Sequence, residues 1–206
     1  MSSTTEIVAR LRHQAEPSSR FMVGIAGPPG SGKSTIAAQL CDELVKAGES
    51  AIVVPMDGFH FDDAILNARG HRARKGAPHT YDVAGFEVLL KRIKARESDI
   101  AIPVFDRSLE LARAAAGIIS AEAKFILVEG NYLLLDHAPW ERLKLLFDFA
   151  IFLDVSEMEL ERRLIARWLG LGFDKAGARE KALGNDIPNA RLVLKSSTKA
   201  NLTISG

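Results

Sequence analysis

Residues 27–34 read Gly-Pro-Pro-Gly-Ser-Gly-Lys-Ser and fit the pattern G-x-x-x-x-G-K-[ST]. They lie between an apolar run, residues 21–26, and a stretch from Lys33 to about Ala47 with helical periodicity. Glycines allow successive backbone N–H groups to wrap around an anion, and the start of the following helix adds a positive end. The sequence therefore predicts a phosphate-binding loop, which comprises Gly27, Gly30, Ser31, Gly32, Lys33, Ser34 and Thr35.

Two side chains of this loop have specific expected roles. The Lys33 ammonium would neutralise the β- and γ-phosphates of a nucleotide, and the Ser34 hydroxyl would ligate a magnesium ion. The expected cofactors are therefore ATP and Mg²⁺.

Short apolar runs alternate with helical periodicity along the rest of the chain. Pro103 indicates an edge or irregular position for one of these runs, residues 100–105. The alternation favours an α/β fold of the P-loop NTPase type, a three-layer αβα sandwich with a mainly parallel central sheet. Strands are expected at 21–26, 51–56, 100–105, 125–128 and 150–153, and helices at 33–47, 84–96 and after Ser156, where Glu159 completes a capping box.

Two segments interrupt this alternation. Residues 62–82 are polar and basic, and residues 169–184 contain four glycines. Both are expected to be functional insertions or mobile segments rather than parts of the core.

The composition indicates one near-neutral domain. The 206 residues include 27 Lys plus Arg against 26 Asp plus Glu, so no nucleic-acid or acidic-membrane surface is expected. The longest uncharged stretch, residues 21–32, is too short to span a bilayer, and residues 1–20 contain no apolar core of a secretory signal. With Cys41 as the lone cysteine and expected in the core, the predicted location is the cytoplasm; a homodimer is left open.

Asp57 follows the second expected strand, within Pro55-Met56-Asp57-Gly58. Ligands of open α/β sheets bind beyond the carboxyl ends of the strands, so a carboxylate there can orient an acceptor hydroxyl and accept its proton. The alternative is that Asp57 only stabilises a turn with Gly58. The chain contains neither the N-K-x-D of GTPases nor the L-S-G-G-Q of ABC-type ATPases, which favours a kinase.

Further motifs follow the phosphate-binding loop in a fixed order. They are M-D-G-F at 56–59, R-K-G-A-P at 74–78 with Y-D at 81–82, P-V-F-D-R at 103–107, V-E-G at 128–130, and an arginine-bearing helix before a glycine-containing segment. From about residue 21 to 204 the chain resembles the P-loop kinases that include uridine kinase, phosphoribulokinase and bacterial pantothenate kinase. Residues 128–135 and 185–189 look most similar to a short subgroup described as fructose transport system kinases or fructokinase-like proteins.

The resemblance implies roles for individual residues. Asp57 matches the catalytic base, and Glu129 matches the Walker B acid, with Asp154 as a competitor at the end of another strand. Arg163 and Arg167 lie four apart on one helical face and match lid arginines that close on phosphates; a solvated charged face is the alternative. The lid would span about residues 160–184, and an acceptor-site insertion about residues 58–82.

The resemblance also places the acceptor at this insertion. The basic run from Arg69 to Lys75 contains no acid, which indicates an anionic or polyhydroxyl acceptor. Uridine kinases carry a Tyr and a later His after the proline-containing strand, whereas this chain has Asp106 and Arg107, which are candidates for contacting sugar hydroxyls or a phosphate. Residues 185–189 are a candidate adenine pocket, with a helix-start turn as the alternative. The expected acceptor residues are Asp57, His60, Arg74, Lys75, Tyr81, Asp106 and Arg107.

These observations predict a single-domain, ATP-dependent kinase that phosphorylates a hydroxyl group of a small molecule. A sugar such as fructose is the favoured acceptor, on the subgroup resemblance alone. The alternatives are a nucleoside or pantothenate-type kinase, a nucleotide kinase whose acceptor is a phosphate, and an ATP-binding regulatory protein linked to a transport operon.

Overall fold

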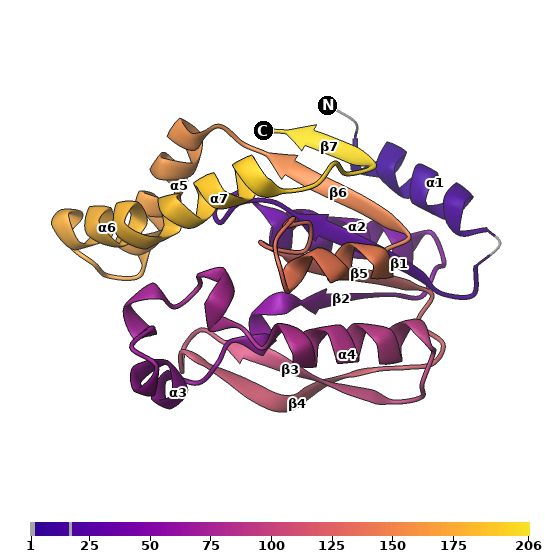
Figure 1. Ribbon diagram of the computed structural model, residues 1–206. Coiled ribbons are helices and arrows are strands. Elements are labelled where there is room, and N and C mark those ends of the chain that lie inside the picture. The colour runs from indigo at the N-terminus through magenta and orange to yellow at the C-terminus, as the bar shows by residue number, and fades with distance from the viewer. Residues whose placement is uncertain (1–2, 17) are drawn as a thin grey trace.

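The computed structural model describes residues 3–16 and 18–206. Its centre is a sheet of five parallel strands in the order β2-β5-β1-β6-β7 (Figure 1). This confirms the predicted parallel α/β sheet and four of its expected strands. The strands span β1 Phe21–Ala26, β2 Ala51–Pro55, β5 Phe125–Gly130, β6 Phe149–Asp154 and β7 Leu202–Ser205. The helices span α1 Thr4–Ala15, α2 Lys33–Lys46, α3 Asp63–Ala68, α4 Val83–Lys94, α5 Glu157–Gly170, α6 Lys175–Lys181 and α7 Ile187–Ser196.

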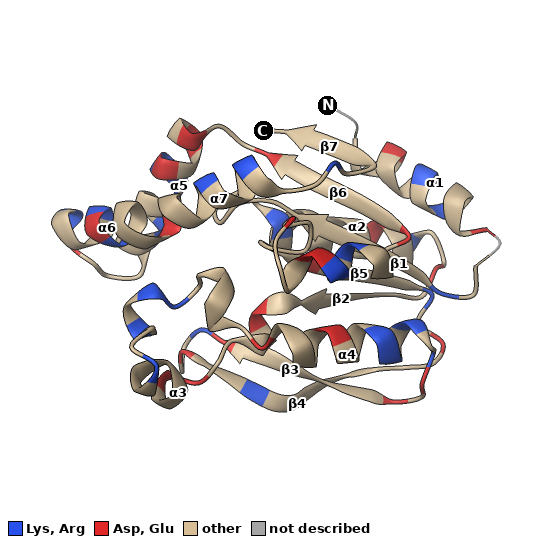
Figure 2. Ribbon diagram, in the orientation of Figure 1, with Lys and Arg blue, Asp and Glu red and all other residues tan. Residues whose placement is uncertain are grey.

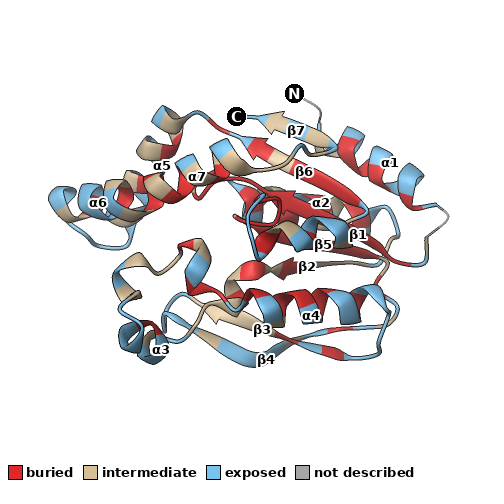
Figure 3. Cartoon of the chain, viewed as in Figure 1, coloured by how far each residue is buried: buried red, intermediate tan, exposed pale blue. Residues whose placement is uncertain are grey.

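Helices cover both faces of the sheet because successive strand residues point to opposite sides. In β1, Val23 and Ile25 pack in one cluster with the buried residues of α1 and α2. Met22 and Ala26 belong to the cluster on the other face, with Phe86 of α4. The central strands β1 and β5 are therefore buried on both faces, as Figure 3 shows for the centre of the molecule. This is the expected three-layer sandwich.

The run at 100–105 forms a strand that lies outside the central sheet. It is β3, Ile100–Asp106, and it pairs antiparallel with β4, Leu111–Ile119, in a two-stranded hairpin (Figure 1). The register shifts between Ile102 and Val104, at Pro103, which confirms the irregular position expected there. Sequence analysis missed β4 because this strand is alanine-rich and largely exposed, so it shows no regular alternation of apolar and polar residues.

The glycine-containing segment, residues 169–184, is mostly helical. A turn follows Gly170, α6 comes next, and a π-helical turn, Ala182–Asp186, leads directly into α7. The expected capping box of α5 is only half formed. Glu159 N donates to Ser156 Oγ over 3.4 Å, but the Glu159 carboxylate binds the guanidinium groups of Arg162 and Arg163 instead of the backbone of Ser156.

The polar segment after β2 is built from short helices. A 3-10 turn, Met56–Phe59, carries Asp57, and α3 and two further 3-10 turns, Arg72–Arg74 and Pro78–Thr80, precede α4. Acidic and basic residues are interspersed along the outer helices (Figure 2), as the near-zero net charge suggested. Within the described ranges, no helix combines the length and apolar character needed to cross a membrane.

Candidate active site

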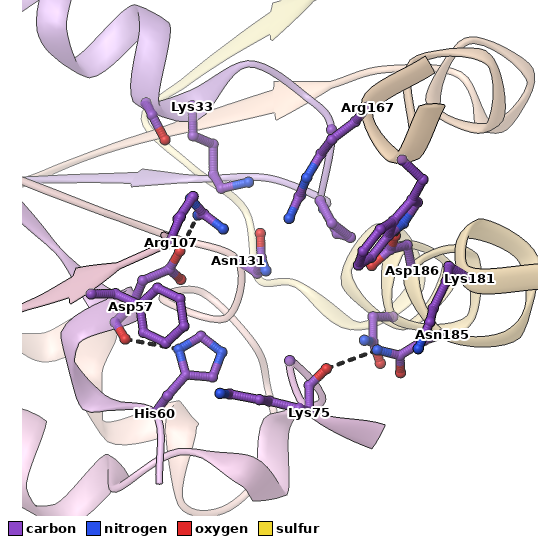
Figure 4. Close-up of a pocket in the computed structure, with 18 of the residues that line it drawn as sticks. Lys33, Asp57, His60, Lys75, Arg107, Asn131, Arg167, Lys181, Asn185 and Asp186 are labelled. Carbon is purple, nitrogen blue, oxygen red and sulfur yellow. Dashed lines mark hydrogen bonds and ion pairs between the residues drawn. The ribbon is translucent and has the colours of Figure 1, made fainter. Parts of the chain in front are cut away.

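A cavity of about 700 Å³ lies at the carboxyl ends of the central strands. Its walls come from the phosphate-binding loop, the turn after β2, the segment before α4, the tip of the β3–β4 hairpin, the end of β5, and the helices from α5 to α7. Segments far apart in the sequence thus meet around one space (Figure 4).

The phosphate-binding loop has the conformation that its glycines allow. Gly30 and Gly32 have φ values of 80° and 93°, in the left-handed region that side-chain-bearing residues avoid. A Cβ atom on Gly30 would also lie 3.1 Å from Leu164 Cγ of α5, so the loop packs tightly against the predicted lid helix. Gly32 precedes α2 without a capping side chain, which leaves N–H groups of the first helical turn available for an anion. Gly30, Gly32, Lys33, Ser34 and Thr35 line the cavity, whereas Gly27 and Ser31 do not.

Lys33 is buried at the floor of this cavity. Its Nζ donates a hydrogen bond to the carbonyl oxygen of Pro28 over 2.9 Å. Burial lowers the pKa of Lys33 to about 8, although the carboxylates of Glu129 and Asp57 act in the opposite direction. An anion bound in the loop would therefore interact with an ammonium group that makes few hydrogen bonds to the protein.

Ser34 and Glu129 face each other across the start of α2 and the end of β5. Ser34 Oγ donates to Glu129 Oε1 over 3.2 Å, and Glu129 is 8% exposed. Burial raises the pKa of Glu129, which Lys33 partly counteracts. Asp154, the competing candidate, is exposed at the end of β6 and does not line the cavity.

This pair of oxygen ligands fits a magnesium ion. Mg²⁺ prefers oxygen ligands and usually takes only one or two of them from the protein, with the remainder from phosphates and water. The described residues contain no cluster of three or more His, Cys, Asp or Glu side chains suited to a metal. The site therefore fits a metal that arrives with a polyphosphate.

Asp57 lies at the start of the 3-10 turn after β2 and lines the cavity beside Lys33 (Figure 4). Its Oδ2 accepts a hydrogen bond from Arg107 Nη2 over 2.6 Å, across from the hairpin tip. The ion pair brings together two residues that are 50 positions apart and that sequence analysis had both assigned to the acceptor site.

His60 and Tyr81 form the wall next to Asp57. The rings of His60 and Tyr81 lie 4.1 Å apart, and Phe105 lies 4.8 Å from His60 on the hairpin. His60 Nδ1 is 2.8 Å from the Asp57 carbonyl oxygen, and burial lowers the pKa of His60. A neutral ring in this position donates from Nδ1, which leaves Nε2 as a hydrogen-bond acceptor.

The basic run before α4 is divided between the cavity and other contacts. Arg72 and Lys75 line the cavity, and both pair with Asp63. Arg74 is directed elsewhere: its guanidinium donates to the Gly184 carbonyl oxygen and to Asn189 Oδ1.

Asp106 is also outside the cavity lining. It accepts hydrogen bonds from Ser108 and pairs with Arg113. Of the seven expected acceptor residues, the structure therefore brings five together and leaves Arg74 and Asp106 apart.

The two arginines predicted to belong to a lid lie on the opposite wall. Arg163 donates from Nε to Glu159 Oε1 over 2.7 Å and from Nη1 to the Ser31 carbonyl oxygen over 3.4 Å, so it touches the phosphate-binding loop. Arg167 lines the cavity and extends toward Lys33 in Figure 4. Arg162 pairs with Glu159 on the exposed side of α5, as expected for a residue on another face.

Sequence analysis missed several lining residues. Trp168 comes from α5, Lys181 comes from α6, and Asn131 lies two residues after Glu129. Asn131 lies within the 128–135 motif, two residues after Glu129, and this proximity in sequence could have indicated it. Lys181 had no such signal, because only the turn between α5 and α6 brings it to the cavity. Asn185 and Asn189 of the suggested adenine pocket also line it, and Asn185 Nδ2 donates to the Lys75 carbonyl oxygen over 2.8 Å.

The chain is similar in sequence to several known proteins. Residues 22–179 match the phosphoribulokinase/uridine kinase family. The uncharacterized protein YggC of Escherichia coli K12 is 35% identical, over 91% of this chain and 78% of that protein. A provisionally named uridine kinase of Schizosaccharomyces pombe is 30% identical, over 99% of this chain and 91% of that protein.

A solved structure is similar over the whole length. It is a provisionally named fructose transport system kinase from Silicibacter sp. TM1040, with a TM-score of 0.95 and 38% sequence identity. The alignment covers 99% of this chain and 100% of the other.

Proposed function

The chain belongs to the phosphoribulokinase/uridine kinase family, and we propose that it transfers the γ-phosphoryl group of ATP to a hydroxyl group of a sugar or related polyol. Membership of this family by itself indicates an ATP-dependent phosphotransferase that acts on an alcohol. The single observation that carries the proposal is the position of Asp57, a carboxylate that shares one cavity with Lys33 of the phosphate-binding loop.

In the proposed reaction, ATP binds with its phosphates in the loop formed by residues 27–35. Lys33 neutralises charge on the β- and γ-phosphates, and Ser34 and Glu129 hold the accompanying Mg²⁺. The ion, when bound, supplies charge neutralisation and orientation of the phosphate oxygens.

Asp57 is the proposed base. It accepts the proton of the acceptor hydroxyl while that oxygen forms a bond to the γ-phosphorus, and the bond from the γ-phosphorus to the β–γ bridging oxygen breaks. ADP and the phosphorylated acceptor are the products. Arg107 binds Asp57 Oδ2, which leaves Oδ1 to accept the proton while the ion pair holds the carboxylate in place.

Residues 160–184 are the proposed lid, with Arg163 and Arg167 stabilising charge on the transferring group. Lys181 adds a third cation from the same region. Because phosphoryl transfer involves little covalent participation by protein groups, these positively charged side chains would contribute mainly by positioning and charge stabilisation.

A sugar acceptor is supported by the Silicibacter relative, whose name refers to fructose transport. A hydroxyl acceptor is favoured over a phosphate acceptor by Asp57, because a phosphate needs no carboxylate base. Nucleoside and pantothenate-type acceptors, and an ATP-binding regulatory role without rapid turnover, remain the competing functions.

The decisive experiment measures ADP release by the purified protein with MgATP and a panel of acceptors. The panel contains D-fructose and other sugars, sugar phosphates, uridine, UMP and pantothenate. We expect turnover with a sugar or polyol. Turnover with UMP alone would indicate a nucleotide kinase, and ATP binding without ADP release for any acceptor would favour the regulatory role.

A further inference from the structure

We infer that the acceptor is an uncharged alcohol, not a phosphate ester or a carboxylate, an inference that rests on the proposed function. The observation behind it is a set of ion pairs at the end of the cavity beyond Asp57. Three cations line this end, Arg72, Lys75 and Arg107, and each already binds a carboxylate of the protein.

Lys75 is the most constrained of these cations. Its side chain is 7% exposed, and its Nζ donates to Asp63 Oδ1 and to the Glu110 carbonyl oxygen, each over 2.8 Å. The Glu110 carboxylate lies 3.5 Å from the same nitrogen. These two hydrogen bonds use two of the three ammonium hydrogens, and an acceptor anion would have to compete with the Glu110 carboxylate for the third.

The other two cations are also paired, each through one nitrogen of a more exposed guanidinium group. Arg72 Nε lies 2.7 Å from Asp63 Oδ2, and Arg107 Nη2 lies 2.6 Å from Asp57 Oδ2. Within the basic run, the two cations that line the cavity are thus paired with protein carboxylates, Asp63 nine residues before Arg72 and Glu110 on the hairpin. Arg69 and Arg74 lie outside the cavity lining.

Acidic groups would also oppose an anion directly. Glu110 and Asp57 both line this end of the cavity, so a phosphate or carboxylate on the acceptor would lie among like charges. In contrast, the side facing the phosphate-binding loop has Lys33 and Arg167, which form no salt bridge within the described parts of the chain (Figure 4). The surplus positive charge therefore lies where ATP phosphates are proposed to bind.

What remains for recognition at the acceptor end is uncharged. His60 offers Nε2, Asn131 offers an amide, and Tyr81 and Phe105 offer ring faces. Hydrogen-bonding groups beside apolar ring faces suit the hydroxyls and C–H groups of a polyol. We expect kcat/KM for a neutral acceptor to exceed that for its anionic counterpart by at least about tenfold. An anionic acceptor would have to displace one of the ion pairs within the protein, and the loss of one such pair is enough for a tenfold effect.

The test uses matched pairs of acceptors that differ by one charged group. The probes are D-fructose with fructose 6-phosphate, D-ribose with ribose 5-phosphate, and panthenol with pantothenate, each assayed by ADP release with MgATP. The inference expects the neutral member to be preferred in every pair that supports turnover. Preference for an anionic member in any pair would overturn it, while no ADP release with any acceptor would contradict the proposed function as well.

A charge variant tests the cause of the selectivity. Glu110→Gln removes the negative charge that lies 3.5 Å from Lys75 Nζ and keeps the hydrogen bond to the Glu110 carbonyl oxygen. Anionic probes should therefore gain at least several-fold relative to neutral ones, in kcat/KM or in inhibition constant for a probe that is not turned over. Glu97→Gln is the matched control, because it makes the same charge change at an exposed pair with Arg92. Equal ratios in Glu110→Gln and Glu97→Gln would overturn the inference.

Discussion

Lys33 combines burial with a task that needs its charge. Because burial lowers the pKa of Lys33 to about 8, part of the free protein carries a neutral amine at pH 8. Binding of a polyphosphate favours the charged form, so the lysine should take up a proton when the nucleotide binds. Well below pH 8 Lys33 is already charged, so the number of protons taken up on nucleotide binding is small. This number grows as the pH rises through 8, and the nucleotide affinity falls over the same range.

Calorimetry in buffers with different ionisation enthalpies measures this uptake. The titration is done with ATP in the absence of Mg²⁺, so that a proton lost from Glu129, whose pKa is raised by burial, does not contribute. Lys33→Arg is the control, because a guanidinium stays charged and should take up no proton. Identical proton uptake in the two proteins at pH 8 would show that Lys33 is not its source.

A substitution at Asp57 tests its proposed role as the base. Asp57→Asn keeps the shape of the side chain but removes the base, so we expect kcat to fall by about 10²-fold to 10⁴-fold with little change in ATP affinity. Asp106→Asn is the matched control, since Asp106 lies outside the cavity lining. Retention of kcat within a few-fold in Asp57→Asn would exclude the carboxylate as base.

At the scale of elements, Arg20 joins the hairpin to the central sheet. It is 7% exposed, and its guanidinium donates to four carbonyl oxygens, of Ile93, Ser120, Ala121 and Ala123. Arg20→Met leaves these oxygens without their donor, which should reduce the free energy of unfolding by at least about 3 kcal/mol. The control is Arg12→Met, which breaks an exposed ion pair with Glu49 and should reduce the free energy of unfolding by less than about 1 kcal/mol. Urea denaturation measures both variants. Similar losses in Arg20→Met and Arg12→Met would contradict the structural role given to Arg20.

Arg74 connects the acceptor-site segment to the lid side. Its guanidinium reaches the π-helical turn at Gly184 and α7 at Asn189, so Arg74→Met should loosen this contact. We expect faster amide hydrogen exchange in residues 182–189 and a several-fold higher KM for the acceptor, with ATP affinity unchanged. Arg69→Met is the control, because Arg69 only stacks on Phe61; unchanged exchange in Arg74→Met would contradict the coupling.

The elements differ in how far the sequence could predict them. The central strands and the phosphate-binding loop were predictable because each depends on a contiguous run of residues. The hairpin strand β4 was not, since its alanines carry no periodic signal. The charge state of the acceptor end was not, since Lys75 pairs with Asp63 and with Glu110, which are 12 and 35 positions away. Local patterns thus located most of the candidate site, while the ion pairs that set its selectivity needed the fold.

At the scale of the whole molecule, the cavity brings together the phosphate-binding loop, the acceptor segment, the hairpin and the lid helices. A ligand in this cavity contacts segments spread between residues 29 and 189, so its binding energy should stabilise the fold as a unit. At a MgATP concentration of 100 times Kd the gain is about 2.7 kcal/mol, which for a domain of this size corresponds to a rise in Tm of about 5–10 °C.

Thermal denaturation with and without ligand tests this expectation. The rise should shrink when EDTA removes Mg²⁺, because Ser34 and Glu129 then lose the ion they are proposed to hold, and it should vanish in Lys33→Ala. ADP with Mg²⁺ should stabilise the protein less than a non-hydrolysable ATP analogue, because only the analogue has a γ-phosphate to engage Arg163 and Arg167. Equal shifts for the two nucleotides would mean that the lid arginines do not contact that phosphate, whatever the loop binds.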